Sequence, residues 1–333
     1  MKFAVLGNGA WGTALARLLY LNHQKVILWG IDKNLSDDIN NNHKLTKYFQ
    51  DSVILPEKLK STTNLNEAVK NADALVFTIP TFAVRNVASE AQKYISKKVH
   101  IVTGAKGFEP VTLKRMSEVL REEITEEKRY EIVSLIGPSH AEEVIKDMLT
   151  AVTSTCVDLN EAKLIQQIFS NKFFRVYTNT DEIGAEYCAA IKNTIAIASG
   201  ILEGLNYGDN ARAALVTRSL AELYRLVTKI GGKFETLSGL AGLGDLMVTC
   251  NSYHSRNFQV GLAIGKANEA KTYLSHNTLT AEGIKTAESL YFLAKKYNIE
   301  MPICHAVYEV LYLDKKPSDL IDELMGRPLK SEK

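Results

Sequence analysis

Residues 2–22 read KFAVLGNGAWGTALARLLYLN, and this stretch predicts a strand, a tight turn and a helix in direct succession. Lys2 to Leu6 form a short apolar run typical of a buried parallel strand, and the later residues form an amphipathic helix. A GxGxxG motif at Gly7, Gly9 and Gly12 joins them. Here the first glycine permits the turn, the second lets the backbone approach a pyrophosphate, and the third lets helix pack on strand. The motif predicts dinucleotide binding at the helix N-terminus. The alternative is a glycine-rich turn without a function.

Apolar runs continue to alternate with helical patterns up to about residue 180. Residues 33–70 are more polar and predict a helix, a loop through Pro56 and a second helix. Alternation of strands and helices specifies a mostly parallel, Rossmann-like α/β sheet. The further predicted strands are 25–30, 73–79, 99–103, 132–136, 151–156 and 173–177, and the predicted helices are 81–94, 111–123 and 160–170.

After about residue 184 the pattern predicts helices only. We therefore expect two domains, a dinucleotide-binding domain at 1–183 and an all-helical substrate-binding and catalytic domain at 184–333. Clefts between domains are the usual place for a site. The predicted helices of the second domain are 184–205, 210–229, 256–270, 280–297, 303–312 and 317–325.

The first helix of the second domain contains EYCAAIKNTIAIASGILEGL at 186–205, which is apolar almost all the way round. Such a helix is normally buried, yet Lys192 lies in its middle. Removal from water lowers the pKa of a lysine towards neutrality, which makes it usable as a general acid or base. The alternative is that Lys192 lies along the surface with its ammonium group in water.

Polar residues follow the predicted strands at their carboxyl ends, where ligands bind in open α/β sheets. Asp32 lies at the end of the second strand, where its carboxylate would accept hydrogen bonds from the hydroxyls of the adenosine ribose. The alternative is that Asp32 only caps the next helix. Lys33 beside it could instead contact a 2′-phosphate. Lys106 follows the strand 99–103, beside a glycine that permits close approach, although an isolated lysine is more often a solvated loop residue. Gly137 and Ser139 follow the strand 132–136.

A second dense motif, SGLAGLGDLMVTCNSYHSRN, spans residues 238–257. Its glycines and small residues before Asp245 indicate tightly packed backbone. Ser255 is a good N-cap for a helix that starts at Arg256 and Asn257. Free N–H groups, a guanidinium and an amide would then converge, a combination that suits a phosphate. The alternative is an ordinary capped helix with an exposed arginine.

The composition excludes several classes of protein. The chain has 333 residues, of which 46% are hydrophobic and 23% charged, which is ordinary for a globular protein. Its net charge of +2 does not indicate non-specific binding of nucleic acid. Four scattered cysteines indicate reduced thiols and a cytoplasmic protein with no metal site. We see no signal segment, and no apolar run reaches the ~18 residues of a membrane span.

The chain resembles bacterial NAD(P)-dependent glycerol-3-phosphate dehydrogenases over nearly its whole length. The Lys192 helix and the Asp245–Asn257 motif are specific to this family. The resemblance implies interconversion of sn-glycerol 3-phosphate and dihydroxyacetone phosphate with NAD(H) or NADP(H), for glycerophospholipid synthesis, by a homodimer. The motifs are GNGAWGTALA at 7–16, AKG at 105–107, GPSHAEEV at 137–144, AAIKNTIAIASGI at 189–201, GLGDLMVTCNSYHSRN at 242–257, AEG at 281–283, MPI at 301–303 and LMGRPLK at 324–330.

The resemblance also implies roles for single residues, with Lys192 as the proton donor and acceptor. Many members have serine where Ala10 stands, which removes a hydroxyl near the pyrophosphate but keeps the backbone N–H. The residues around Asp32 vary in the family, so the choice between NADH and NADPH does not carry over. Substrate binding is implied for Lys106, Gly137, Ser139, Asp245, Ser255, Arg256 and Asn257, and cofactor binding for Ala10, Trp11, Lys106, Ala141, Arg256 and Glu282.

Two other functions fit parts of the pattern. Ketopantoate reductases and 3-hydroxyacid dehydrogenases also join a Rossmann domain to helices, but they need no Ser255-Arg256-Asn257 phosphate site. A non-catalytic sensor of NAD(H) would have no need for Lys192 and Asp245 together. A panel of substrates at fixed NADPH would separate the dehydrogenases, and an assay of absorbance at 340 nm would identify a non-catalytic sensor.

Overall fold

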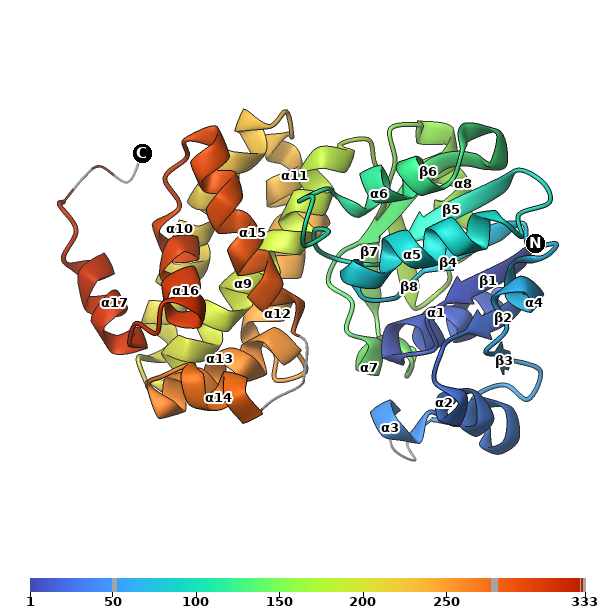
Figure 1. The fold of residues 1–333 in the computed structure, drawn as a ribbon, viewed down its shortest axis with the longest axis horizontal. Helices are drawn as coiled ribbons and strands as arrows, with labels where there is room; N and C mark the ends of the chain where they lie inside the picture. Colours follow the sequence, from blue (N-terminus) through green and yellow to red (C-terminus); the bar gives the residue numbers. More distant parts are fainter. Residues whose placement is uncertain (50–52, 277–280, 330, 332–333) are drawn as a thin grey trace.

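The computed structural model describes residues 1–49, 53–276, 281–329 and 331, and these form a sheet lobe joined to a helical lobe (Figure 1). Within these residues one eight-stranded sheet has the order β3-β2-β1-β4-β5-β6-β7-β8. The strands are β1 (Lys2–Leu6), β2 (Lys25–Trp29), β3 (Lys60–Thr62), β4 (Ala74–Phe77), β5 (Val99–Thr103), β6 (Arg129–Ile136), β7 (Thr150–Thr155) and β8 (Phe174–Asn179).

All neighbouring strands pair in parallel except β6 and β7. The prediction of a mostly parallel sheet is confirmed. The order 3-2-1-4-5-6 is that of doubly wound dinucleotide-binding sheets, whose ligands lie at the carboxyl ends of the strands. Gly7, Gly104 and Gly137 follow the ends of β1, β5 and β6, so the motifs of the sequence meet along one edge.

Helices cover both faces of the sheet because each strand connection returns across it. One face packs on α1, α7 and α8 and the other on α4, α5 and α6. The helical segments of this lobe are α1 (Ala10–Leu21), α2 (Lys33–Asp37), η1 (Asp38–Asn42), α3 (Thr46–Phe49), α4 (Leu65–Val69), α5 (Thr81–Gln92), α6 (Met116–Glu123), η2 (Glu126–Lys128), α7 (Ala141–Val144) and α8 (Leu159–Phe169).

Some predicted boundaries were wrong for local reasons. Residues 33–70 hold several short helices and also the strand β3, which was missed because KST is short and polar. The helix predicted at 111–123 starts only at Met116, since Leu113 has a positive φ of 60°. The helix predicted at 256–270 ends at Ala267, where Asn268 takes the left-handed conformation of a C-cap. Residue 280, in the helix predicted at 280–297, and Lys330 of LMGRPLK lie outside the described residues.

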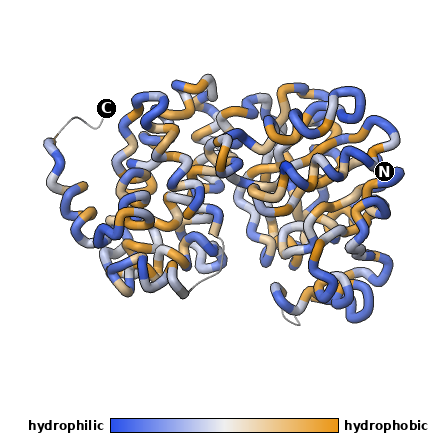
Figure 2. Tube along the Cα trace, viewed as in Figure 1, coloured by the Kyte–Doolittle hydropathy of each residue, from blue (hydrophilic) through white to orange (hydrophobic). Residues whose placement is uncertain are grey.

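The helical lobe is built around α9 (Glu182–Gly204), in which every residue from Gly184 to Leu202 is buried. Figure 2 shows apolar residues recurring along the helices of this lobe. Among the described helices, α9 included, none is long and hydrophobic enough to cross a membrane. The other helical segments are α10 (Gly208–Lys229), α11 (Phe234–Ser238), η3 (Leu240–Gly244), α12 (Asp245–Asn251), α13 (Arg256–Ala267), α14 (Lys271–His276), α15 (Glu282–Tyr297), α16 (Pro302–Tyr312) and α17 (Pro317–Met325).

Glycines bring α9 and α13 into backbone contact. A Cβ on Gly200 would lie 2.1 Å from the Phe258 carbonyl oxygen, and a Cβ on Gly261 would lie 2.0 Å from the Ile197 carbonyl oxygen. Gly204 and Gly265 repeat the contact one turn later. Because α13 starts at Arg256, this close packing fixes the start of α13 relative to Lys192.

Candidate active site

Lys192 lies in the middle of α9 and points at α12. Only 6% of the residue is exposed. Its Nζ donates to Asp245 Oδ1 at 2.5 Å and to Thr249 Oγ1 at 2.9 Å. Burial lowers the pKa of Lys192 to about 8. The negative charge of Asp245 raises this pKa, and the positive charge of Lys106 lowers it further. The arrangement gives an ammonium group that can release its proton near neutral pH.

Asp245 joins Lys192 to the sheet lobe. Its carboxylate is 1% exposed and its Oδ2 accepts from Lys106 Nζ at 3.0 Å, so one buried carboxylate faces two ammonium groups. Lys106 also donates to the Gly137 carbonyl at 3.0 Å and lies 3.5 Å from Ser139 Oγ. The structure therefore brings Lys192 of α9 together with four predicted substrate residues, from the loops after β5 and β6 and from α12.

Two further residues at this centre were missed in the sequence. Thr249 accepts from Lys192 and donates its own hydroxyl proton to the Asp245 carbonyl at 2.5 Å. It lies four residues after Asp245, which puts both on one face of α12. The Asn193 side chain is 3.5 Å from the Lys106 carbonyl oxygen. Periodicity from Asp245 would have found Thr249, whereas only the tertiary structure shows the contact of Asn193.

The start of α13 is the place where the sequence predicts a phosphate site. Ser255 is the N-cap and its Oγ accepts from the Phe258 N–H at 3.2 Å. Arg256 is exposed and has no hydrogen bond or ion pair with any other described residue. Asn257 Oδ1 accepts from the Gly283 N–H at 3.0 Å, which ties α13 to α15. The first-turn N–H groups and a free guanidinium thus lie together, an arrangement that suits a dianion.

The turn between β1 and α1 fits a bound pyrophosphate. Gly7 has a φ of +128°, and a Cβ on Gly12 would lie 1.8 Å from the Gly7 carbonyl oxygen, so both positions require glycine. Nothing lies within 4 Å of a Cβ on Gly9, the N-cap of α1, and no side chain caps that helix. The buried indole N–H of Trp11 has no partner among the described residues. Open space and free donors therefore remain where the cofactor is expected, next to Ala10.

Three other predicted cofactor residues lie at the starts or ends of elements. Asp32 follows β2, and its carboxylate accepts from the Asn34 N–H at 3.0 Å as the N-cap of α2. The cap is therefore present, and the ribose contact stays a prediction. Ala141 is the buried first residue of α7. Glu282 begins α15 and accepts from the Thr81 N–H of the sheet lobe at 3.3 Å; burial raises its pKa to about 7.

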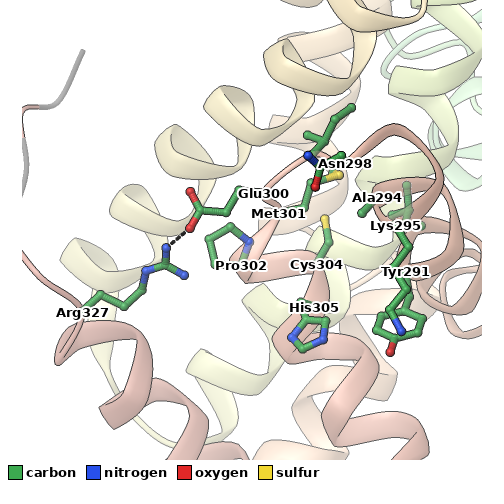
Figure 3. Close-up of a pocket in the computed structure, with 12 residues that line it drawn as sticks. Tyr291, Ala294, Lys295, Asn298, Glu300, Met301, Pro302, Cys304, His305 and Arg327 are labelled. Carbon is green, nitrogen blue, oxygen red and sulfur yellow. Dashed lines mark hydrogen bonds and ion pairs between the residues drawn. The ribbon is translucent and has the colours of Figure 1, made fainter.

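A separate cavity of about 320 Å³ lies between α15, α16 and the C-terminal segment (Figure 3). Tyr291, Cys304 and the Glu300–Arg327 ion pair line it. None of the predicted site residues is among the described residues that line it, so it plays no part in the site above.

Comparison with known proteins gives a consistent result. Residues 2–162 match the family model described as the N-terminus of NAD-dependent glycerol-3-phosphate dehydrogenase, and residues 181–322 match the C-terminus of the same family. The glycerol-3-phosphate dehydrogenase [NAD(P)+] of Lysinibacillus sphaericus is 45% identical over 331 residues, covering 99% of this chain and 98% of the relative. That of Bacillus pumilus is 45% identical, covering 98% and 94%.

A solved structure extends the similarity to three dimensions. The crystal structure of glycerol-3-phosphate dehydrogenase from Coxiella burnetii superposes with a TM-score of 0.91 at 36% identity, covering 98% of this chain and 99% of that one. Both lobes and their connection are therefore shared.

Proposed function

The chain belongs to the NAD-dependent glycerol-3-phosphate dehydrogenase family, and on that basis we propose how its residues act. It is an oxidoreductase that interconverts sn-glycerol 3-phosphate and dihydroxyacetone phosphate with NAD(H) or NADP(H). The expectation from the sequence is confirmed. Membership of this family excludes the three alternatives, which were a ketopantoate reductase, a 3-hydroxyacid dehydrogenase and a non-catalytic sensor.

Lys192 is the general acid and base. When dihydroxyacetone phosphate is reduced, the bound nicotinamide supplies a hydride and the carbonyl oxygen needs a proton. The Lys192 ammonium, desolvated in α9, donates that proton and stabilises the developing alkoxide. Asp245 holds the ammonium in place, and the second ammonium, of Lys106, adds positive charge at the same carboxylate. The observation that carries this proposal is the buried Lys192–Asp245 pair.

Ser255, Arg256 and Asn257 hold the substrate phosphate at the start of α13, while Gly137 and Ser139 border the reacting end. Binding of a remote phosphate orients the carbonyl and supplies energy that the reacting centre uses. Gly7, Gly9, Ala10, Trp11 and Gly12 hold the pyrophosphate. Asp32, Lys106, Ala141, Arg256 and Glu282 complete the cofactor site.

The test of Lys192 is the alanine variant, assayed by the absorbance of the reduced nicotinamide. Lys192→Ala should bind the cofactor normally and lose turnover by roughly 10²–10⁴-fold, the usual contribution of a general acid or base. Turnover within a few-fold of the wild type would remove Lys192 from this role.

Three wider expectations follow from family membership. The first is the division into a dinucleotide-binding domain at 1–183 and a helical domain at 184–333; because β8 ends at Asn179 and α9 begins at Glu182, this division falls in the first turn of α9. The chain works as a cytoplasmic homodimer, which light scattering on the purified protein tests. Its product supplies glycerophospholipid synthesis, which a growth requirement for glycerol 3-phosphate after gene loss tests.

A further inference from the structure

One stripe of α9 faces the sheet lobe. Glu182 and Glu186 are four residues apart, and Ala189 and Asn193 continue the same face by steps of three and four. Ala189 packs with Ile136 of β6, and Asn193 contacts the Lys106 carbonyl oxygen. Lys192 is one position before Asn193, about 100° around the helix, and so faces α12 instead. The rotation of α9 about its own axis therefore decides where Lys192 points.

The N-terminal end of this stripe is held by buried charges. Glu186 Oε1 accepts from the Ser117 N–H at 3.0 Å and from Ser134 Oγ at 3.2 Å. Its Oε2 accepts from Ser117 Oγ at 2.5 Å and from Arg115 Nη1 at 2.9 Å. Four donors and no acceptor meet this side chain, which suits a carboxylate. Burial raises the pKa of Glu186, and the Arg115 guanidinium opposes that rise.

Glu182 completes the cluster, which we call the α9 anchor. Arg115 Nη1 donates to Glu182 Oε1 at 2.9 Å, and both terminal nitrogens of Arg121 donate to its two oxygens at 2.8 and 2.6 Å. The α9 anchor consists of Arg115, Ser117 and Arg121 around α6, Ser134 on β6, and Glu182 and Glu186 on α9. The cluster thus connects α9 to β6, the strand that Gly137 follows.

Stability alone gives a weak reason for such a cluster. A buried ion pair can often be replaced by apolar side chains without loss, because desolvation offsets most of the attraction. Directional bonds do, however, fix an orientation that apolar contacts leave free. A helix with its side chains has a radius of about 5–6 Å, so a rotation of about 10° moves a side chain by about 1 Å. A displacement of that size at a reacting group can reduce the rate by about 100-fold.

We propose that Glu186 is a positioning residue for the dehydrogenase reaction: through the α9 anchor it fixes the rotation of α9 and so holds Lys192 against Asp245. The proposal rests on the role of Lys192 given above. Within the described part of the chain, Glu186 has no hydrogen bond to any proposed substrate or cofactor residue, and its effect passes through the helix.

The test is Glu186→Gln. The amide has the same size, but an NH₂ group replaces one of the two accepting oxygens. This NH₂ group must then face a donor of Ser117 or Arg115, and that hydrogen bond is lost. We expect kcat for reduction to fall by about 10- to 100-fold, while KM for NADPH changes by less than about twofold. The alkaline limb of the kcat–pH profile should also move, because the pKa of Lys192 depends on its distance from Asp245. The titratable groups that interact with Lys192 are Asp245, Lys106, His140, Cys250 and Glu282.

The matched control is Glu222→Gln in α10. Glu222 is also a buried carboxylate, but it accepts from the Ile303 and Cys304 N–H groups within the helical lobe and has no hydrogen bond to the sheet residues that the structure describes. Its variant should lower Tm while leaving kcat and the pH profile as in the wild type. If Glu186→Gln behaves like this control, the α9 anchor is only structural and the proposal is wrong.

A milder variant covers the case in which Glu186→Gln does not fold. Ser134→Ala removes one donor from β6 and leaves every charge in place. It should lower kcat by about threefold and move the same pH limb in the same direction. An unchanged kcat and limb would overturn the proposal. Wild-type turnover in Lys192→Ala would instead overturn the proposed function, so the two failures are distinguishable.

Discussion

Two opposing effects set the pKa of the Lys192 ammonium group. Burial favours the neutral amine, while the Asp245 carboxylate at 2.5 Å favours the cation. The pKa of about 8 that results leaves most molecules protonated at neutral pH. The same residue can therefore donate a proton in reduction and accept one in oxidation with little change in free energy.

The pH dependence of the two directions should differ in sign. Reduction needs the ammonium form, so its kcat should be constant below pH about 8 and fall above it, whereas oxidation should rise through the same pH. Asp245→Asn removes the carboxylate that raises the pKa of Lys192, so the limb should move to lower pH in that variant. The measurement is the kcat–pH profile of each direction in the wild type and in Asp245→Asn. If the limb does not move in the variant, it belongs to a group other than Lys192.

A variant of Asp32 can test what sets the preference between NADH and NADPH. A carboxylate at the end of β2 repels a 2′-phosphate and accepts from a 2′-hydroxyl, while Lys33 beside it could contact a phosphate. We expect the enzyme to use both cofactors and Asp32→Ala to shift kcat/KM towards NADPH. The measurement is kcat/KM for both cofactors in the wild type and the variant. An unchanged ratio would mean that Asp32 serves only as the N-cap of α2.

At the scale of the element, the first turn of α13 is the proposed phosphate site. Arg256→Ala should raise KM for dihydroxyacetone phosphate by about 10- to 100-fold, as expected for the loss of a charge-assisted contact, and change KM for dihydroxyacetone much less. Arg175→Ala, on the exposed face of β8, is the control. Equal losses with both substrates would show that Arg256 is structural or serves the cofactor.

The crossing of α9 and α13 depends on glycine. Gly261→Ala would place a Cβ 2.0 Å from the Ile197 carbonyl oxygen, so the helices must separate, at a cost of at least about 1–3 kcal/mol. Gly244→Ala is the control, since the nearest atom to its Cβ lies at 3.6 Å. Thermal unfolding should show a clear fall in Tm for Gly261→Ala and little for Gly244→Ala. Equal Tm values would show that the two helices can move apart freely.

At the scale of the molecule, the sequence predicted the two-lobed plan because strand and helix periodicities differ so clearly on either side of residue 184. It did not predict β3, whose three residues are held by the pairing with β2 and have no apolar pattern. Nor did it predict the α9 anchor. Arg115, Ser134 and Glu186 are far apart in the chain, and nothing local marks a charge that will be buried.

The candidate site shows the same division. Glycines, the lysine in α9 and the N-cap at Ser255 have local signatures, so their residues could be named from the sequence. The bridge from Asp245 to both lysines, and the contact of Glu282 with Thr81, arise only when the two lobes meet. Interactions between distant segments set the geometry of the site, whereas local patterns identify its parts.

The buried Glu222 should make folding less favourable as the pH rises towards neutrality. Glu222 is 1% exposed, and burial raises its pKa from 4.5 to about 7. Between these values the folded protein holds a proton that the unfolded chain has released, so folding is favoured at the acidic end and this contribution is lost as pH rises through about 7. Glu282 has a similarly raised pKa and acts in the same direction. The side chain of Glu222→Gln cannot titrate, so Tm should fall less steeply between pH about 5 and 8 in the variant than in the wild type. Circular dichroism melts of the wild type and the variant measure this, with Glu57→Gln, a change at an exposed carboxylate, as control. A slope as steep in Glu222→Gln as in the wild type would show that Glu222 is already ionised in the folded protein throughout this range.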